Sequence, residues 1–231
     1  MRLMRHLAAA AALATVAGLA SAGPVATVMI DGASYEMASF EADGQFHLVP
    51  AVYTFGDTTV EALPGPRDAG ATMAYGIAVV DFGTASTFSF VLSMPITLDP
   101  GATTIVSSIV GGMTDFTGNG VGISTTGGFG TIQRSWVGAP DTDLGVDVGP
   151  SLAVGPGPSG SLYNYGAYAT GPVAGPDLSG FTTLNVGVDF TASGDNDVIV
   201  LTGFTDIVVI PAPASMALLA GVGLVSRRRR A

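Results

Sequence analysis

The alternation of apolar and polar residues in two segments constrains the fold of this chain more than any other feature. Large apolar residues occupy every second position in residues 88–94 and again in residues 184–190. A period of two places successive side chains on opposite faces of a strand, so both segments predict half-buried β-strands. The residues predicted to lie in the core are Phe88, Phe90, Leu92, Leu184, Val186, Val188 and Phe190.

Strand-like segments continue from residue 23 to residue 210, and Gly and Pro clusters separate them. No apolar stripe at helical spacing occurs in this range. Many short strands with frequent turns are typical of antiparallel sandwiches. The sequence therefore predicts an all-β domain at residues 23–210, an antiparallel β-sandwich with a jelly-roll-like winding. Its further strands are predicted at residues 25–30, 34–40, 45–49, 71–82, 103–110, 130–137, 161–168 and 198–209.

Two regions rich in Gly and Pro, residues 111–130 and 138–160, do not fit the strand pattern. Gly loses the most backbone entropy on folding, so both regions are predicted to be loops or lightly packed edges. They are interpreted either as plain connectors or as binding loops on the rim of the sandwich.

The composition of residues 23–210 limits the partners of this domain. It contains two arginines against eighteen Asp or Glu residues, a difference of 16 negative charges, and the chain has no Lys. Such a surface repels nucleic acids and anionic headgroups, so no nucleic-acid partner is expected. The chain has no Cys, no disulfide and no thiol nucleophile. No Ser nucleophile elbow occurs either, so the sequence predicts a protein that is not an enzyme, without catalytic residues.

The first 22 residues have the three parts of a secretory signal peptide. Arg2 and Arg5 supply the positive charge, and an apolar segment of about 13 residues follows, shorter than the roughly 20 that a spanning helix needs. Ala20 and Ala22 flank Ser21 in a small-residue cleavage site. The pattern predicts a signal helix at residues 1–22 that is removed on export, so that Gly23 becomes the N-terminus.

The last 21 residues form a second targeting signal. They contain Pro211, Ala212 and Pro213, an apolar segment at residues 214–225 and a terminal basic cluster. The cluster consists of Arg227, Arg228, Arg229 and Arg230. Because arginines at the end of an apolar segment stay on the cytoplasmic side of a membrane, the rest of the chain is expected outside.

Together the two ends resemble bacterial proteins with a PEP-CTERM sorting tail. Pro211 and Pro213 match the two prolines of that motif, Ala212 stands in place of its Glu, and the arginines match its basic end. The resemblance covers residues 211–231 and the signal peptide. It implies export, a transient inner-membrane anchor, processing by an exosortase-type enzyme, and delivery to the cell surface or extracellular matrix.

The tail is short for a membrane span. Its apolar segment has about 12 residues, or roughly 18 Å of helix. Extending this C-terminal hydrophobic helix upstream through residues 207–210 would give the length needed to cross about 30 Å of hydrocarbon. The sequence therefore predicts a weak, temporary transmembrane helix.

Two acidic clusters are candidates for binding calcium. Asp141, Asp143 and Asp147 alternate with other residues, which places carboxylates on one side of an extended turn. Ca²⁺ binds six to eight oxygens and tolerates such flexible geometry, although the cluster lacks the EF-hand pattern. A second cluster, residues 195–197, follows Gly194 and is interpreted as either a calcium site or a hairpin turn.

Two functions from different classes remain open. One is a non-enzymatic surface or matrix protein, with matrix polysaccharide as a partner. The other is a secreted carbohydrate-binding or carbohydrate-active protein with a carboxylate site on the rim. The second would be favoured if Glu36, Glu41 or Glu61 faced an Asp across a cleft beside Trp136, Tyr163 or Tyr165.

Overall fold

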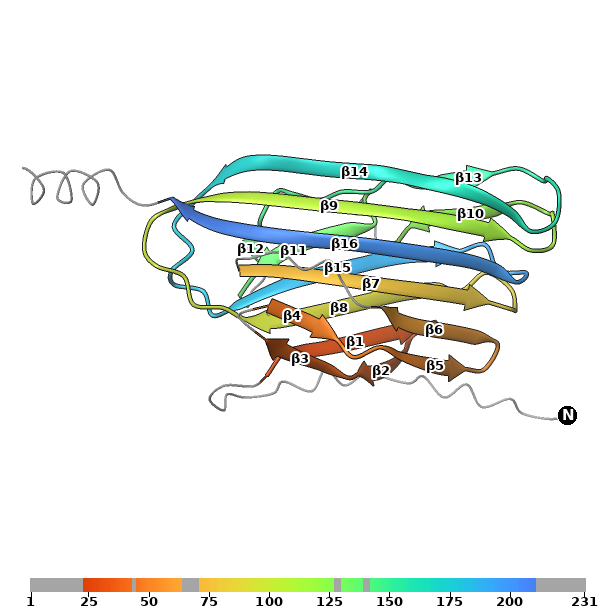
Figure 1. Ribbon diagram of the computed structural model, residues 1–231, viewed down its shortest axis with the longest axis horizontal. Coiled ribbons are helices and arrows are strands. Elements are labelled where there is room, and N and C mark those ends of the chain that lie inside the picture. The colour runs from red at the N-terminus through yellow and green to blue at the C-terminus, as the bar shows by residue number, and fades with distance from the viewer. Residues whose placement is uncertain (1–22, 43–44, 64–70, 127–129, 139–141, 211–231) are drawn as a thin grey trace, which may run out of the picture.

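The computed structural model describes residues 23–42, 45–63, 71–126, 130–138 and 142–210, which form two eight-stranded β-sheets (Figure 1). Within these ranges the chain contains strands, turns and bends but no helix. The predicted all-β sandwich is therefore confirmed. The predicted signal helix at residues 1–22 and the tail at residues 211–231 lie outside the described residues. No helix suitable for crossing a membrane occurs in the described part of the chain.

The first sheet is antiparallel throughout. Its order is β12 (Thr142–Asp143), β11 (Gln133–Val137), β15 (Thr183–Ala192), β8 (Thr87–Pro95), β1 (Val25–Ile30) and β2 (Ala33–Met37), with β10 (Val121–Thr125) also paired to β15 and to β13 (Leu152–Val154). On the side of β15 that does not pair with β8, β10 pairs with one part of the strand and β11 with the other.

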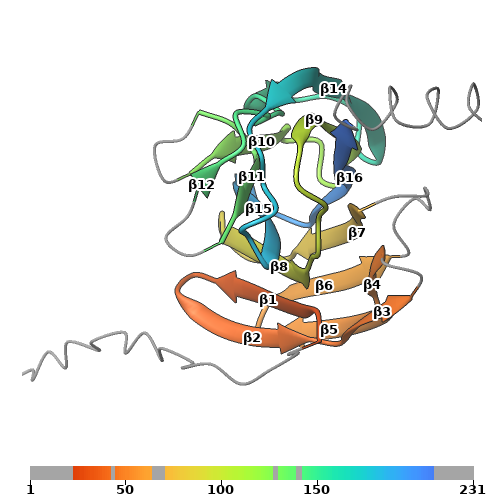
Figure 2. The same cartoon turned by 90° about the vertical axis from the view of Figure 1, so that its left-hand side faces the viewer.

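The second sheet contains the longest strands. Its order is β14 (Ser161–Gly175), β9 (Ala102–Asp115), β16 (Asp197–Ile210), β7 (Ala71–Asp81), β4 (Gln45–Leu48) and β3 (Ser39–Ala42), with β6 (Thr58–Leu63) paired to β7 and to β5 (Ala51–Phe55). All pairs are antiparallel except β4 with β7. Figure 2 shows the N-terminal strands β1 to β6 gathered on one side of the sandwich.

The chain changes sheet at most steps after β6. Strands β7, β8, β9 and β10 alternate between the two sheets, and so do β13, β14, β15 and β16. As a result β16 inserts between β7 and β9, and β15 lies between β8 and the strands β10 and β11. This interleaving brings turns that are far apart in sequence to the same end of the molecule.

The core lies between the facing surfaces of the two sheets. All seven residues predicted for it from the alternation of residues 88–94 and 184–190 are fully buried, with exposed fractions of 0%. The rings of Phe88 and Phe190 stack with centroids 5.3 Å apart, and their backbones are paired between β8 and β15. The period-two interpretation is therefore confirmed at its two strongest segments.

A neutral polar cluster crosses this core. The hydroxyl group of Tyr75 donates to Gln133 Oε1 at 2.6 Å, and Gln133 Nε2 donates to Ser107 Oγ at 2.6 Å. The hydroxyl groups of Ser135 and Thr205 are 2.6 Å apart. Since Gln133 and Ser135 lie on β11 of the first sheet and the others on the second, these hydrogen bonds link the sheets. We call these five residues the core network.

The prediction that residues 111–130 form a loop or a lightly packed edge was wrong for much of that stretch. β9 continues to Asp115, and β10 begins at Val121. The glycines reflect close packing, because a Cβ on Gly111 would lie 2.4 Å from the carbonyl oxygen of Val200 on the neighbouring strand.

The hairpin of β5 and β6 was not predicted, although the Gly-Asp pair at its turn is a hairpin signal.

The upstream extension of the tail was also wrong. Residues 207–210 belong to β16, where they pair with β9 along the full stretch. Their apolar side chains alternate between the core and the outer face, with Ile207 buried and Val208 half exposed. In the folded domain these residues are therefore part of the sheet and do not lengthen a membrane helix.

Candidate functional site

Several connections between strands meet at one end of the sandwich, on the right in Figure 1, which we call the turn end, and five of them carry or adjoin its carboxylates. They join β1 to β2, β5 to β6, β7 to β8, β9 to β10 and β15 to β16, and comprise residues 31–32, 56–57, 82–86, 116–120 and 193–196. Six carboxylates belong to these connections or to the strand residues beside them: Asp31, Asp57, Asp81, Asp115, Asp195 and Asp197.

Hydrogen bonds between the connections fix their relative positions. The amide of Thr87 donates to Asp31 Oδ1 at 2.8 Å, which joins the β1–β2 turn to the start of β8. The amide of Asp195 donates to the carbonyl of Gly83 at 2.7 Å. Asn119 Nδ2 donates to Asp195 Oδ2 at 2.8 Å. The turn end is thus a built surface in which segments distant in sequence hold one another.

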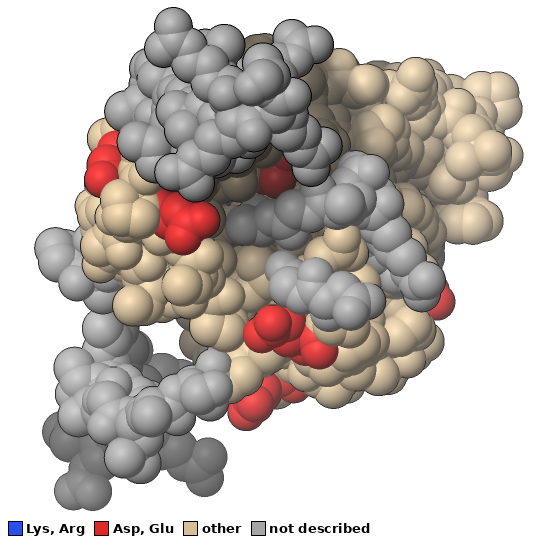
Figure 3. Space-filling model, turned by 60° about the vertical axis from the view of Figure 1, so that its left-hand side comes forward, with Lys and Arg blue, Asp and Glu red and all other residues tan. Residues whose placement is uncertain are grey.

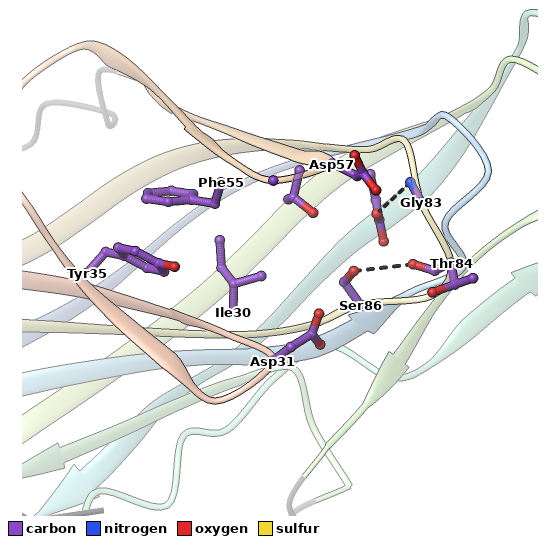
Figure 4. A pocket seen from close by; sticks show the side chains of 11 residues that line it. Ile30, Asp31, Tyr35, Phe55, Asp57, Gly83, Thr84 and Ser86 are labelled. Atoms are coloured by element: carbon purple, nitrogen blue, oxygen red, sulfur yellow. Dashed lines mark hydrogen bonds between the residues drawn. The ribbon is translucent and has the colours of Figure 1, made fainter. Parts of the chain in front are cut away.

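A pocket of about 350 Å³ opens among three of these connections. Figure 4 shows the side chains of Tyr35 and Phe55 on one side of it and Asp57 on another. The β1–β2 hairpin, the β5–β6 hairpin and the β7–β8 connection supply its walls. Its lining residues are Ile30, Asp31, Tyr35, Phe55, Gly56, Asp57, Thr58, Asp81, Gly83, Thr84 and Ser86. We call this cavity the end pocket.

Aromatic rings form one wall of the end pocket. The rings of Tyr35 and Phe55 are tilted by 34° with centroids 4.0 Å apart, and Tyr53 stacks parallel to Phe55 at 6.3 Å. The Tyr53 hydroxyl is held in turn, because it accepts a hydrogen bond from the amide of Ala38 at 3.1 Å. Stacked rings supported in this way form a rigid apolar surface.

Three buried aspartates lie side by side across the second sheet, next to the end pocket. Asp197 on β16 is paired with Asp81 on β7. The register of β16 with β9 pairs Val198 with Thr114, which places Asp197 level with Asp115. The exposed fractions of Asp81, Asp115 and Asp197 are 0%, 0% and 1%. We call these three residues the aspartate row.

Asp115 is fully satisfied by the backbone of the β9–β10 connection. Its Oδ1 accepts the amides of Thr117 at 3.1 Å and Gly118 at 2.6 Å, and its Oδ2 accepts the amide of Gly120 at 2.8 Å. Burial acts to raise its pKa, but these donors outweigh burial and lower the pKa below the usual 3.8. Asp115 is therefore an ionised carboxylate at neutral pH.

The other two members of the aspartate row are not satisfied. Asp81 Oδ2 and Asp197 Oδ1 are buried without a hydrogen-bond partner. Asp81 Oδ1 accepts the amide of Gly83 at 3.3 Å, Ser86 also acts to lower the pKa of Asp81 by hydrogen bonding, and Asp197 Oδ2 accepts the hydroxyl of Ser193. Burial raises both pKa values, that of Asp197 to about 6, and the neighbouring carboxylates raise them further.

The first predicted calcium cluster lies only partly within the described residues. Asp141 lies outside them. Asp143 is exposed on β12, where its Oδ1 accepts the amide of Gly145 at 2.7 Å. Burial, then the charge of Asp143, raises the pKa of Asp147, which accepts the amide of Ser135 at 3.3 Å. No group of three or more His, Asp or Glu side chains in the described ranges is arranged to hold a metal.

The second acidic cluster, residues 195–197, forms the β15–β16 hairpin turn. Asp195 and Asn196 adopt positive φ angles of 58° and 67°, as turn residues do. Asp197 begins β16 and points into the core. The signal for the aspartate row in the sequence is an Asp at the end of a strand followed closely by Gly, as in residues 81–83 and 115–118.

The arrangement expected of a glycosidase does not occur beside Trp136. Its ring lies over Gly187, where an added Cβ would meet it at 2.9 Å, and Arg134 lies 5.3 Å from the ring centroid. Arg134 also pairs with Asp189 at 3.4 Å. The three glutamates, Glu36, Glu41 and Glu61, are exposed on β2, β3 and β6. Tyr165 is buried in the core and Tyr163 packs against it.

Acidic side chains otherwise lie in separate patches on the surface. Figure 3 shows Asp and Glu side chains in several groups, divided by uncharged residues, with no Lys or Arg among the described residues visible on this face. Exposed carboxylates distributed in this way suit solubility more than chemistry.

No protein-family model and no curated protein matches the chain. Among solved structures, the chain is similar to that of TmCBM61 in complex with beta-1,4-galactotriose, with 14% sequence identity. The match covers 68% of this chain and 90% of that chain, with a TM-score of 0.25. A similarity at this level carries no argument about function.

Proposed function

We propose that this chain is an exported, non-catalytic protein of the cell surface or extracellular matrix whose end pocket binds neutral carbohydrate. The observation that carries the proposal is the composition of the pocket walls. An aromatic wall of Tyr35 and Phe55 stands near hydrogen-bonding groups of Asp31, Asp57 and Ser86. Pockets that bind small molecules combine an apolar surface with a few well-placed polar groups.

Each wall matches one side of a sugar ring. The faces of a pyranose carry C–H groups that pack against aromatic rings, and its edges carry hydroxyl groups. Carboxylates accept hydrogen bonds and donate none when ionised, so Asp31 and Asp57 suit ligands that donate from hydroxyl groups. The hydroxyl group of Thr84 can both donate and accept, whereas that of Ser86 donates to the carbonyl of Thr84 at 3.2 Å and can accept from a ligand.

The charge of the pocket restricts the ligand class. Asp31, Asp57 and Asp81 line it, and no Lys or Arg does so among the described residues. Like charges repel, so uronic-acid polymers and sulfated glycans are disfavoured. We therefore expect selectivity for uncharged hexose or pentose polymers.

The same geometry favours binding over hydrolysis. A glycosidase needs an acid and a second carboxylate on either side of the scissile bond. Asp81 is fully buried, and Asp31 Oδ1 is engaged by the amide of Thr87. Of the three aspartates that line the pocket, only Asp57 is neither buried nor held by a turn hydrogen bond.

Binding is tested with a glycan array that compares neutral and acidic glycans, followed by titration of the best neutral oligosaccharide. Phe55→Ala removes half of the aromatic wall and should weaken binding at least tenfold. Phe40→Ala, the same change at an exposed Phe outside the pocket, is the control and should leave binding unchanged. Preference for acidic glycans, or equal loss in both variants, would reject the proposed pocket.

The proposed route rests on the two terminal signals. Export would remove Met1 to Ala22, and an exosortase-type enzyme would act near Pro211, Ala212 and Pro213 after a transient anchor in the inner membrane. Intact-mass measurement of surface-extracted protein from a host with that enzyme should find both ends removed. A mature surface form that retains Arg227 to Arg230 would contradict the sorting route.

The winding of the sandwich supports the finer prediction of its topology. The second sheet has the local order β7, β16, β9, β14, and the first sheet has β8, β15, β10, β13. We infer from this order a jelly-roll winding of eight strands, to which the N-terminal strands β1 to β6 are added at one side.

A further inference from the structure

We infer that Asp81 and Asp197 bind a divalent cation, Ca²⁺, at the turn end of the sandwich. The two residues occupy directly opposite positions on β7 and β16. Side chains at such positions share one face of the sheet, with Cβ atoms about 4.5–5.5 Å apart. Both side chains face the interior, with exposed fractions of 0% and 1%.

The negative charge of this pair has no compensating cation within the described part of the chain. Arg134 is the one Lys or Arg among the described residues, and it pairs with Asp189 on the outer face of the first sheet. Asp115 stands on the other side of Asp197, and its two oxygens accept three backbone amides of the β9–β10 connection. Two buried carboxylates beside a third therefore receive no positive charge from the described residues.

The observation that points most directly to a bound cation is a pair of carboxylate oxygens without hydrogen-bond partners. Asp81 Oδ2 and Asp197 Oδ1 are both buried and neither accepts a hydrogen bond. A buried polar atom without a partner destabilises the fold, and an unpaired buried charge costs more. The core network satisfies its own groups, and among the buried side-chain oxygens of the described residues Thr131 Oγ1 is the other one without a hydrogen-bond partner.

A cation with oxygen ligands fits the surroundings. The connections beside the pair present main-chain carbonyls, such as those of Gly83 and Thr84, and the hydroxyl of Ser193. A carbonyl that accepts one hydrogen bond still has a second lone pair. Ca²⁺ accepts mixed sets of carboxylate, carbonyl and hydroxyl oxygens in irregular geometry, whereas Mg²⁺ requires a near-ideal octahedron.

The inference goes beyond carbohydrate binding. Asp81 also lines the end pocket, so a cation here would hold the acidic side of that pocket in place. The cation site is nevertheless tested with metal alone and the pocket with glycan alone. Loss of either function therefore leaves the other measurable.

The test uses the full chain, freed of metal by a chelator and titrated with CaCl₂ at neutral pH. Calorimetry should find one Ca²⁺ per chain, and Ca²⁺ should raise the melting temperature more than Mg²⁺ at equal ionic strength. Asp197→Asn keeps the shape of the side chain and should weaken Ca²⁺ binding at least tenfold. Asp81→Asn is a second, independent variant with the same expectation.

Asp206→Asn is the matched control. Asp206 lies on the same strand but on the outer face, where it accepts a hydrogen bond from Thr72 at 2.9 Å that an amide oxygen can also accept. Its Ca²⁺ binding should equal that of the parent chain. The absence of Ca²⁺ binding at millimolar concentration, equal responses to Ca²⁺ and Mg²⁺, or undiminished binding in both test variants would overturn the inference.

Discussion

The core network and the aspartate row are both buried polar groups between the same two sheets, but only the network is complete. Gln133 joins Tyr75 to Ser107 through its own oxygen and nitrogen, and no charge is involved. Burial raises the pKa of Tyr75 well above its usual value, which keeps its hydroxyl protonated as a donor. In the aspartate row, two carboxylates each keep one oxygen without a partner.

This difference separates polar groups that stabilise the fold from polar groups that need a ligand. A fully paired neutral network specifies how the two sheets fit together and requires nothing further. An unpaired carboxylate pair destabilises the fold until a proton or a cation is added. The network packs closely against the glycine on β16 that faces it, since a Cβ on Gly203 would lie 2.4 Å from Gln133 Oε1.

The largest effect is expected from breaking the network at its centre. Gln133→Leu would leave the hydroxyl groups of Tyr75 and Ser107 without their partner, and each orphaned buried group costs about 1–3 kcal/mol. We expect a loss of about 3–5 kcal/mol in the free energy of unfolding, measured by urea denaturation. A loss below about 1 kcal/mol would show that the network is dispensable.

A smaller effect is expected from titrating the aspartate row without metal. The folded pKa of Asp197, about 6, exceeds its ordinary value of 3.8, so the folded state binds the extra proton between these values. Stability should therefore fall as the pH rises from about 4 to 6, by on the order of 2 kcal/mol, and change little above that.

The contribution of Asp197 is isolated by subtracting the pH profile of Asp197→Asn from that of the parent, because Asp115 and Asp177 have lowered pKa values and act in the opposite direction. With Ca²⁺ present the trend should reverse, since metal ligands must be deprotonated. Identical profiles with and without Ca²⁺ would favour a shared proton as the only partner of the pair.

The smallest effect is expected from removing one hydroxyl group of the network. Tyr75→Phe keeps the ring in the core but deprives Gln133 Oε1 of its donor. The expected loss is about 1–2 kcal/mol, with no change in its pH dependence. A pH-dependent loss would mean that the network and the aspartate row are coupled, which would contradict the interpretation of the network as complete and independent.

Local patterns in the sequence predicted the parts of the fold that they determine. The alternation around Phe88 and Phe190 located the central strands of the first sheet, because burial on one face leaves a period of two. The glycines near Gly111 were misinterpreted as a loop because glycine occurs both where neighbouring strands pack closely and where a loop is flexible. The local sequence does not distinguish these two cases.

The candidate site was harder to predict because it is made of distant segments. Asp81, Asp115 and Asp197 become neighbours only through the register of three long strands. The pairing of Tyr35 with Phe55 depends on two hairpins that belong to different sheets. The acidic cluster at residues 195–197 was recognised, but its partners could not be found from spacing along the chain.

The position of β16 has a mechanical consequence for a protein held at a surface. This strand ends at Ile210 and is paired with β7 over residues 197–207 on one side and with β9 over residues 198–210 on the other. If the residues that follow it serve as an anchor, as proposed, tension on the anchor pulls along the axis of a central strand. The two ladders would then be loaded in shear, so their hydrogen bonds share the force instead of opening one after another. The sandwich would resist detachment by flow better than if its last strand lay at an edge.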